Sequence, residues 1–159
     1  ILAQRPDLAI KELRGNVPTR IEKLRQGQYD AILLARAGVL RLELDLSDLE
    51  TIVLDPSTFI PAPAQGVLGL QTRVADVATN EILQKLQHSD VATRIELERS
   101  VLRQMDGGCQ LPLGVYCVDD HVYVSFSPAS TLAATNRTYS YVPGQETELA
   151  FSIVQELKK

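Results

Sequence analysis

Short apolar runs alternate with one amphipathic stretch near the start of the chain. Residues 8–12 can form a short strand, and the near-continuous apolar run 30–35 fits a parallel strand buried on both faces. Between them Val17, Ile21 and Leu24 recur at helical spacing, while the charged residues fall outside that stripe. The order strand, helix, strand predicts a βαβ unit.

The middle of the chain predicts short elements interrupted by a proline-rich segment. A helix is expected over about 37–42, and a short strand over 51–54. The segment 60–66 cannot be regular because its two prolines lack amide hydrogens and fix the φ angle, so we interpret it as a hinge. The run 67–71 predicts another buried strand.

Two helices are predicted next. One covers 76–86, and the second, longer helix begins with Ser89 or Asp90 as its N-terminal cap. Gly107 and Gly108 are expected to end it in a left-handed conformation. The predicted buried stripe of this helix comprises Val91, Ile95, Leu102 and Met105.

The hydrophobic period then changes from helical to alternating. Apolar residues alternate with Tyr123 and Ser125, the stretch 138–142 is rich in β-forming residues, and Asp119-Asp120 suits a hairpin turn. A final amphipathic helix is predicted from Leu149, Ile153, Val154 and Leu157. This last part is therefore expected to be an α+β unit separate from the βαβ part.

Composition narrows the classes of function. The 159 residues are 45% hydrophobic and carry a formal net charge of −4 with dispersed cations, so a folded protein without a nucleic-acid surface is expected. No apolar run could span a bilayer and no signal peptide is visible, so we expect a cytoplasmic protein without membrane contact. Because the chain begins at Ile1, it is expected to be a piece of a longer protein.

The two cysteines, Cys109 and Cys117, are expected to be free thiols, and two histidines leave little material for a zinc site or a Cys–His pair. Cys109 follows two glycines that can expose it, yet a helix carboxyl end gives no reason for a reactive thiolate. It is either open to a carbon electrophile or a buried structural thiol. Cys117, within an apolar run, fits the structural role better.

Two arginines flank the start of the first predicted helix. Between Arg14 and Arg20, Asn16 is a candidate cap, with Thr19 and Glu22 as a competing capping box. Free amides at a helix start together with two guanidinium groups suit a carboxylate or phosphate, although the spacing of a phosphate loop is absent. The alternative is that both arginines are ordinary surface residues.

A second pair of arginines, Arg36 and Arg41, flanks the next predicted helix. They again follow the carboxyl end of a predicted strand, where open α/β sheets bind their ligands. Two neighbouring loops with arginines favour a binding face, and ordinary surface charge is the alternative.

Several stretches in register resemble the porphobilinogen deaminase (hydroxymethylbilane synthase) family. They are Leu13-Arg14-Gly15-Asn16-Val17-x-Thr19-Arg20, Tyr29-Asp30-Ala31-Ile32-Leu33-Leu34-Ala35, Pro61-Ala62-Pro63-x-Gln65-Gly66, Glu98-Arg99 and Gly107-Gly108-Cys109-Gln110-x-Pro112-x-Gly114. The resemblance runs from Arg5-Pro6-Asp7 to the terminal helix, and it is with the C-terminal portion of such an enzyme.

The resemblance implies an α/β plus α+β architecture, in which two α/β lobes similar to periplasmic binding proteins precede a small α+β C-terminal domain. Residues 1–60 would be part of the second lobe, 61–86 the hinge and return segment of the first lobe, and 87–159 the domain carrying the cofactor cysteine. The main body of the first lobe would lie outside this chain. The family's catalytic aspartate would lie there too, so no catalytic residue is expected here.

The implied reaction joins four porphobilinogen units head to tail, with loss of ammonia each time, to give hydroxymethylbilane for heme and other tetrapyrroles. Loss of ammonia creates an azafulvene electrophile, and the Cys109 sulfur would form the thioether that holds a dipyrromethane cofactor. Arg14, Arg20 and Arg41 match the family's clamps for the acetate and propionate groups of cofactor and substrate, and Gln65 matches a hinge glutamine. The implied partners are porphobilinogen, the growing polypyrrole and the missing N-terminal lobe, in a monomeric whole enzyme.

The chain departs from the family pattern at a few positions. Pro18 and Ala64 stand where the family commonly has glycine, and Arg36 replaces a small residue beside the cleft. Pro18 falls in the first helical turn, where a missing amide costs little. Arg36 either adds a carboxylate contact or points outward. The competing hypothesis for the chain is a non-catalytic anion-binding module with a fold like that of periplasmic binding proteins.

Overall fold

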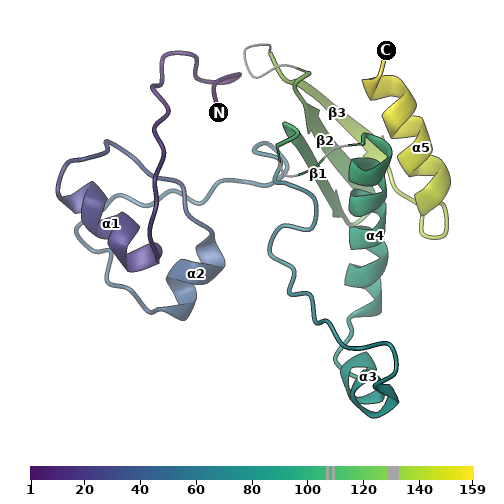
Figure 1. Ribbon diagram of the computed structural model, residues 1–159. Helices are drawn as coiled ribbons and strands as arrows, with labels where there is room; N and C mark the ends of the chain where they lie inside the picture. The colour runs from purple at the N-terminus through teal and green to yellow at the C-terminus, as the bar shows by residue number, and fades with distance from the viewer. Residues whose placement is uncertain (107, 109, 129–132) are drawn as a thin grey trace. The chain divides into compact units, whose positions relative to one another are not determined.

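The computed structural model describes residues 1–106, 108, 110–128 and 133–159, which form two compact units, 1–54 and 55–159 (Figure 1). The first unit contains the helices α1 (Val17–Arg25) and α2 (Arg36–Arg41). The second contains α3 (Val77–Gln84), α4 (Ser89–Gln104), β1 (Leu113–Val118), β2 (His121–Phe126), β3 (Thr135–Ser140) and α5 (Glu146–Leu157). The chain is thus a mixed α and β protein, as expected.

The amphipathic helix predicted near the N-terminus is present as α1. Asn16 is its cap, because its Oδ1 accepts hydrogen bonds from the backbone amide (2.9 Å) and the hydroxyl (2.7 Å) of Thr19. Ile21 is buried, while Val17 and Leu24 on the same stripe are half-buried. The prediction of this helix and its buried stripe is therefore confirmed.

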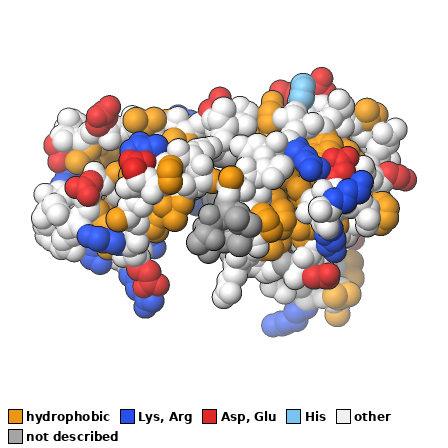
Figure 2. All heavy atoms as spheres, turned by 90° about the horizontal axis from the view of Figure 1, so that it is seen from above, with side chains coloured by type: hydrophobic (Ala, Val, Ile, Leu, Met, Phe, Trp, Pro, Cys, Tyr) orange, Lys and Arg blue, Asp and Glu red, His pale blue; other side chains and the backbone are white. Residues whose placement is uncertain are grey.

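The predicted βαβ unit is not formed, because the described residues of 8–12, 30–35, 51–54 and 67–71 belong to no strand. Their apolar side chains lie largely open to solvent; Ile52 and Leu68, for example, are each 74% exposed. Figure 2 shows that hydrophobic side chains lie among charged ones on one face of the protein. A strand forms only when its backbone pairs with a neighbouring strand, and hydrophobic pattern alone does not reveal whether a neighbour is available.

The three strands form one antiparallel sheet in the order β1-β2-β3. Val115 pairs with Val124 across β1 and β2, and Thr138 of β3 pairs with Tyr123. The predicted hairpin turn at Asp119-Asp120 is present, with Asp119 in the left-handed region (φ 50°). The strand expected at 138–142 lies earlier, at 135–140, because the register with β2 ends there.

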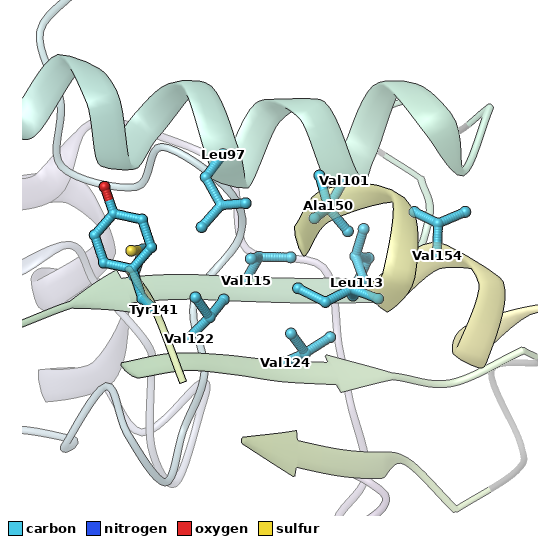
Figure 3. Close-up of a cluster of buried hydrophobic side chains, with 11 residues drawn as sticks. Leu97, Val101, Leu113, Val115, Val122, Val124, Tyr141, Ala150 and Val154 are labelled. Carbon is cyan, nitrogen blue, oxygen red and sulfur yellow. The ribbon is translucent and has the colours of Figure 1, made fainter. Parts of the chain in front are cut away.

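The core of the second unit lies between the sheet and the helices α4 and α5. In Figure 3, Leu97 and Val101 point from α4 toward the sheet, and Ala150 and Val154 approach from α5. The predicted final helix is therefore confirmed. The stripe predicted for α4 is confirmed in part. Leu102 and Met105 pack partly buried against this core, whereas Val91 is 44% exposed, and the fully buried Leu97 and Val101 were not predicted. Helical periodicity alone does not decide which flank of a helix faces a distant sheet.

Both ends of α4 differ slightly from expectation. Ser89 is the first helical residue rather than the cap, and the cap residue His88 makes no side-chain capping bond. At the other end Asp106 takes the left-handed conformation (φ 52°), which aspartate tolerates. Gly108 does not adopt the left-handed conformation. The expected left-handed stop thus falls on Asp106, while Gly107 lies outside the described residues.

Candidate functional site

Arg20 folds back over the start of α1. Its Nε donates a hydrogen bond to the Gly15 carbonyl (2.7 Å), which fixes the half-buried side chain in place. Helical side chains lean toward the N-terminus, so this contact follows from the position of Arg20 in the helix's first turns. Neither Nη atom has a partner among the described residues, so both remain available to a carboxylate.

The start of α1 offers fewer free amides than the sequence predicted. Thr19 donates its amide to Asn16, and Pro18 has no amide hydrogen. Of the first three helical residues, only Val17 has an amide that no described residue accepts. Anion binding at this helix start must therefore depend mainly on guanidinium groups.

Arg14 is held at its backbone by Lys23, and its exposed side chain pairs with Glu12. Lys23 donates a hydrogen bond from Nζ to the Arg14 carbonyl (2.9 Å). The Arg14 guanidinium pairs with Glu12 (Nη2 to Oε2, 3.0 Å), and its side chain is 83% exposed. Exposed pairs of this kind contribute little, so an acidic ligand could replace Glu12. Sequence reasoning missed Lys23, although its position three residues after Arg20 places both on one face of the helix.

Helix α2 packs against the start of α1 through its glycine. A Cβ on Gly38 would lie 3.3 Å from Cγ2 of Val17, so an alanine there would require the Val17 side chain to give way slightly. Arg41 lies three residues after Gly38, just as Arg20 lies three residues after Val17. The two arginines thus lie on helices that approach each other at Val17 and Gly38. Arg41 and Arg36 are exposed, and neither has a hydrogen-bond or ion-pair partner in the described part of the chain.

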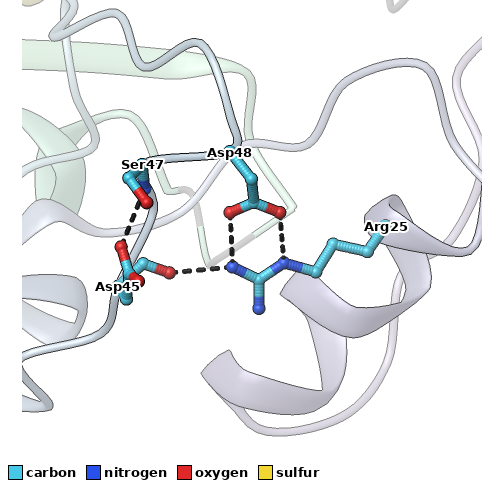
Figure 4. Close-up of polar contacts among 4 residues, drawn as sticks. All are labelled: Arg25, Asp45, Ser47 and Asp48. Atoms are coloured by element: carbon cyan, nitrogen blue, oxygen red, sulfur yellow. Dashed lines mark hydrogen bonds and ion pairs between the residues drawn. The ribbon is translucent and has the colours of Figure 1, made fainter.

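The Arg25 guanidinium, by contrast, is bound by acceptors within the first unit (Figure 4). Its Nε and Nη2 donate to the Asp48 carboxylate (2.8 and 2.7 Å), and Nη2 also donates to the Asp45 carbonyl (2.8 Å). The hydrogen bonds from Arg25 lower the pKa of Asp48, and the amide of Ser47 lowers that of Asp45. This contact holds the 45–48 turn against α1 and is structural.

A hollow of about 720 Å³ lies beside that contact and does not coincide with the predicted arginines. Its lining includes Lys23 and Arg25 but also Glu22 and Asp45. Because this lining carries both signs of charge, it favours no acidic ligand. We therefore place the candidate site at Arg14, Arg20 and Arg41 rather than in the hollow.

Gln65 lies in an exposed turn of the two-proline segment. The backbone amide of Gln65 donates a hydrogen bond to the Ala62 carbonyl (3.1 Å), and the preceding residue, Ala64, is left-handed (φ 62°). The left-handed conformation costs a residue with a Cβ about 1–2 kcal/mol, a cost that glycine avoids. The conformation that a glycine would favour is thus present even though this chain has alanine.

Glu98 is the one buried charged residue among those the structure describes, and sequence reasoning assigned it no role. Its carboxylate accepts hydrogen bonds from the backbone amides of Ala64 (2.7 Å) and Cys117 (2.8 Å). Burial raises its pKa, and the two amide hydrogen bonds oppose that effect. The available signal was a glutamate three residues after Ile95, within the apolar side of α4.

Of the two cysteines, the structure describes only Cys117. Cys117 is buried at 5% exposure, and burial raises the pKa of its thiol to about 11, which agrees with the expected structural role. Cys109 lies outside the described residues, and its neighbours Gly108 and Gln110 are exposed. In the described part of the chain, no cluster of three or more His, Cys, Asp or Glu side chains could hold a metal ion. None of the described helices has the length and hydrophobicity that crossing a membrane requires.

Two family profiles match this chain. Residues 1–81 match "Porphobilinogen deaminase, dipyromethane cofactor binding domain", and residues 92–138 match "Porphobilinogen deaminase, C-terminal domain". The first match covers 81 of the 159 residues, just over half of the chain, and contains the arginines around α1 and α2 as well as Gln65. The chain therefore belongs to the porphobilinogen deaminase family.

Proposed function

We propose that this chain is the part of a porphobilinogen deaminase that holds the dipyrromethane cofactor. In the whole enzyme it would serve the stepwise head-to-tail condensation of four porphobilinogen molecules to hydroxymethylbilane, with release of ammonia. The observation that carries the proposal is the set of available guanidinium groups at α1 and α2. Arg20 has two free Nη atoms, and Arg41 has no partner among the described residues.

The cationic set suits a ligand rich in carboxylates. Acetate and propionate groups on each pyrrole need donors that remain charged, and arginine binds a carboxylate through two parallel hydrogen bonds. Arg20 and Arg41 would hold these groups directly. Arg14 would join them by leaving Glu12, and Arg36 could add a further contact. When bound, the dipyrromethane supplies the primer to which new pyrrole units are added.

Cys109 is the proposed point of covalent attachment. Its sequence neighbours Gly108 and Gln110 are exposed, and a soft sulfur nucleophile suits a single lasting bond to carbon. Cys117 cannot take this role, because it is buried and its thiol pKa is about 11. Gln65 would stand beside the bound pyrroles as an uncharged donor and acceptor.

The exposed apolar runs of the chain favour a further partner, the N-terminal lobe of the same enzyme. Residues 8–12, 30–35, 51–54 and 67–71 have strand-forming sequences and no partner strand among the described residues. With such partners, 1–60 would complete an α/β lobe like those of periplasmic binding proteins, 61–86 would be the hinge and return segment, and 87–159 the C-terminal domain. The catalytic aspartate would belong to that N-terminal lobe. We expect this chain alone not to elongate, and the whole enzyme to be a cytoplasmic monomer.

The mass of the intact whole enzyme tests the attachment. The unaltered enzyme should carry an adduct of two pyrrole units, and Cys109→Ser should lose it. Cys117→Ser is the matched control and should keep it. An active enzyme whose Cys109 is unmodified would contradict the proposal, and anion binding without any adduct would favour the non-catalytic binding module.

The arginine clamp is tested separately by substitution in the whole enzyme. Arg20→Leu or Arg14→Leu should reduce the adduct-bearing fraction or the elongation rate while changing the melting temperature little. Arg103→Leu on the exposed side of α4 is the control, because its ion pair with Glu96 lies outside the proposed clamp. Normal loading and elongation in both clamp variants would remove these arginines from the site.

A further inference from the structure

Glu98 joins two segments that lie far apart in the sequence. Its residue exposure is 3%, and each carboxylate oxygen accepts one backbone amide, Oε2 from Ala64 and Oε1 from Cys117. An ionised carboxylate has acceptors only, whereas a protonated one would direct a hydrogen at one of two donors. The arrangement of donors therefore fits the ionised form.

The segment 60–66 has few other means of attachment. Pro61 and Pro63 lack amide hydrogens, so the Ala64 amide is one of its few donors. Its other tie to the sheet is the Pro61 carbonyl, which accepts a hydrogen bond from the Val115 amide (3.0 Å). Loss of the Glu98 carboxylate would therefore remove one of the two hydrogen bonds that, among the described residues, join this short stretch to α4 and β1.

Close packing supports the same attachment. A Cβ on Gly114 would lie 2.6 Å from the Ile60 carbonyl oxygen, far closer than real Cβ atoms approach. The absence of a side chain at this point of β1 therefore lets the segment lie directly against the strand.

We propose that ionised Glu98 is a positioning residue, which fastens the 60–66 segment to α4 and β1 through Ala64 and so holds the adjacent Gln65 in place. The attachment stands independently, whereas its effect on the reaction rests on the proposed function. Residues 68–71, which follow this segment, are exposed and form no hydrogen bond with the described residues.

Ionisable groups interact with Glu98 or with its partner Cys117 from β1, from α4 and from the region of Tyr141 and Glu146. On β1 these are Tyr116 and Cys117, whose pKa values burial raises first and the charge of Glu98 raises further. Arg94, one turn earlier on α4, has the opposite effect on both. Tyr116 and Cys117 have raised pKa values, and arginine stays charged, so none of the three should titrate in weakly acidic solution.

An NMR titration of the full chain tests the contact without any ligand. The amide proton shifts of Ala64 and Cys117 should follow one shared midpoint above the ordinary glutamate pKa of 4.5. The shared titration should vanish in Glu98→Gln and persist in Glu96→Gln, which removes an exposed carboxylate from the same helix. Independent or absent titration of the two amides would overturn the proposal. This measurement on the unaltered chain decides the matter even if Glu98→Gln fails to fold.

Hydrogen exchange distinguishes positioning from general stabilisation. In Glu98→Gln the Ala64 amide should exchange at least about tenfold faster relative to the core amide of Val124, because the tie to a charged acceptor is lost. In Glu96→Gln the ratio of the two rates should stay unchanged. Equal acceleration of both amides would reduce Glu98 to a general structural residue and overturn the proposal.

Turnover of the cofactor-bearing whole enzyme tests the consequence. Glu98→Gln should lower kcat by about tenfold to a hundredfold with the adduct mass intact, because a small displacement of a positioning group is costly. Glu96→Gln should keep the normal rate. Faster Ala64 exchange with unchanged kcat would overturn the positioning role. An active unaltered enzyme with no adduct would instead contradict the proposed function and leave the attachment standing.

Discussion

At the scale of single residues, burial separates the structural groups from the available ones. Cys117 and Glu98 lie in the interior and have raised pKa values, whereas Arg14 and Arg41 are exposed. Arg20 lies between these cases, because its Nε donates to the Gly15 carbonyl while neither Nη atom has a partner in the described part of the chain. Of these charged or polar groups, only the arginines are open to a ligand, whereas Cys117 and Glu98 are enclosed by the protein.

Cys117 should resist thiol reagents in the folded protein. With a pKa of about 11, roughly one thiol in a thousand is ionised at pH 8, and the sulfur is buried as well. In a Cys109→Ser chain, thiol labelling at pH 8 should be slow when folded and complete after denaturation. Rapid labelling of the folded variant would show that the thiol is accessible.

Glu98 should give stability a characteristic dependence on pH. Because its folded pKa lies above 4.5, the folded state holds the proton longer than the unfolded state does. The unfolding free energy of the unaltered chain minus that of Glu98→Gln should therefore fall as pH rises from 4.5 through the folded pKa, and then level off.

Denaturant unfolding of both proteins over the acidic and neutral range measures this difference. Carboxylates with lowered pKa values, such as Asp48 and Asp55, are common to both proteins and cancel. A difference that rises with pH would contradict the raised pKa.

At the scale of elements, close backbone approach links β1 to the proline-rich segment. Gly114→Ala should destabilise the chain by about 1–3 kcal/mol, because the new Cβ would meet the Ile60 backbone oxygen, which cannot move aside alone. Gly69→Ala is the matched control, since nothing lies within 4 Å of a Cβ there and the backbone needs no left-handed residue. Equal stability of the two variants in denaturant unfolding would refute the close approach.

At the scale of the whole molecule, the two units differ in how they are stabilised. The buried hydrophobic cluster lies entirely within 55–159, whereas Ile21 is the only buried residue of 1–54. Few buried contacts mean a low free energy of local opening. The first unit should therefore open more readily than the second.

Limited proteolysis of the full chain should show this order. Cleavages should appear first within 1–54, leaving a fragment close to 55–159 that persists longer. Leu97→Ala leaves a cavity in the core of the second unit and should shorten the life of that fragment without altering the first cleavages. Simultaneous loss of both units in the unaltered chain would contradict independent stability.

Much of the candidate site was predictable from the sequence, but the way its parts are held was not. The cap at Asn16 and the positions of the arginines near α1 and α2 could be predicted from neighbouring residues in the sequence alone. The loss of free amides to Asn16 and Pro18 needed the actual hydrogen bonds. Glu98 was missed because its partner Ala64 lies 34 residues away.

The sequence by itself determined the helices, the hairpin turn and the family. Helices and tight turns close their hydrogen bonds within a few residues, so caps, spacing and turn residues suffice to predict them. Only the tertiary structure decided which flank of α4 is buried, where β3 ends, and that the apolar runs of 1–54 remain unpaired among the described residues. These features depend on partners distant in the chain, and hydrophobic pattern shows that a residue needs a partner but not which partner it finds.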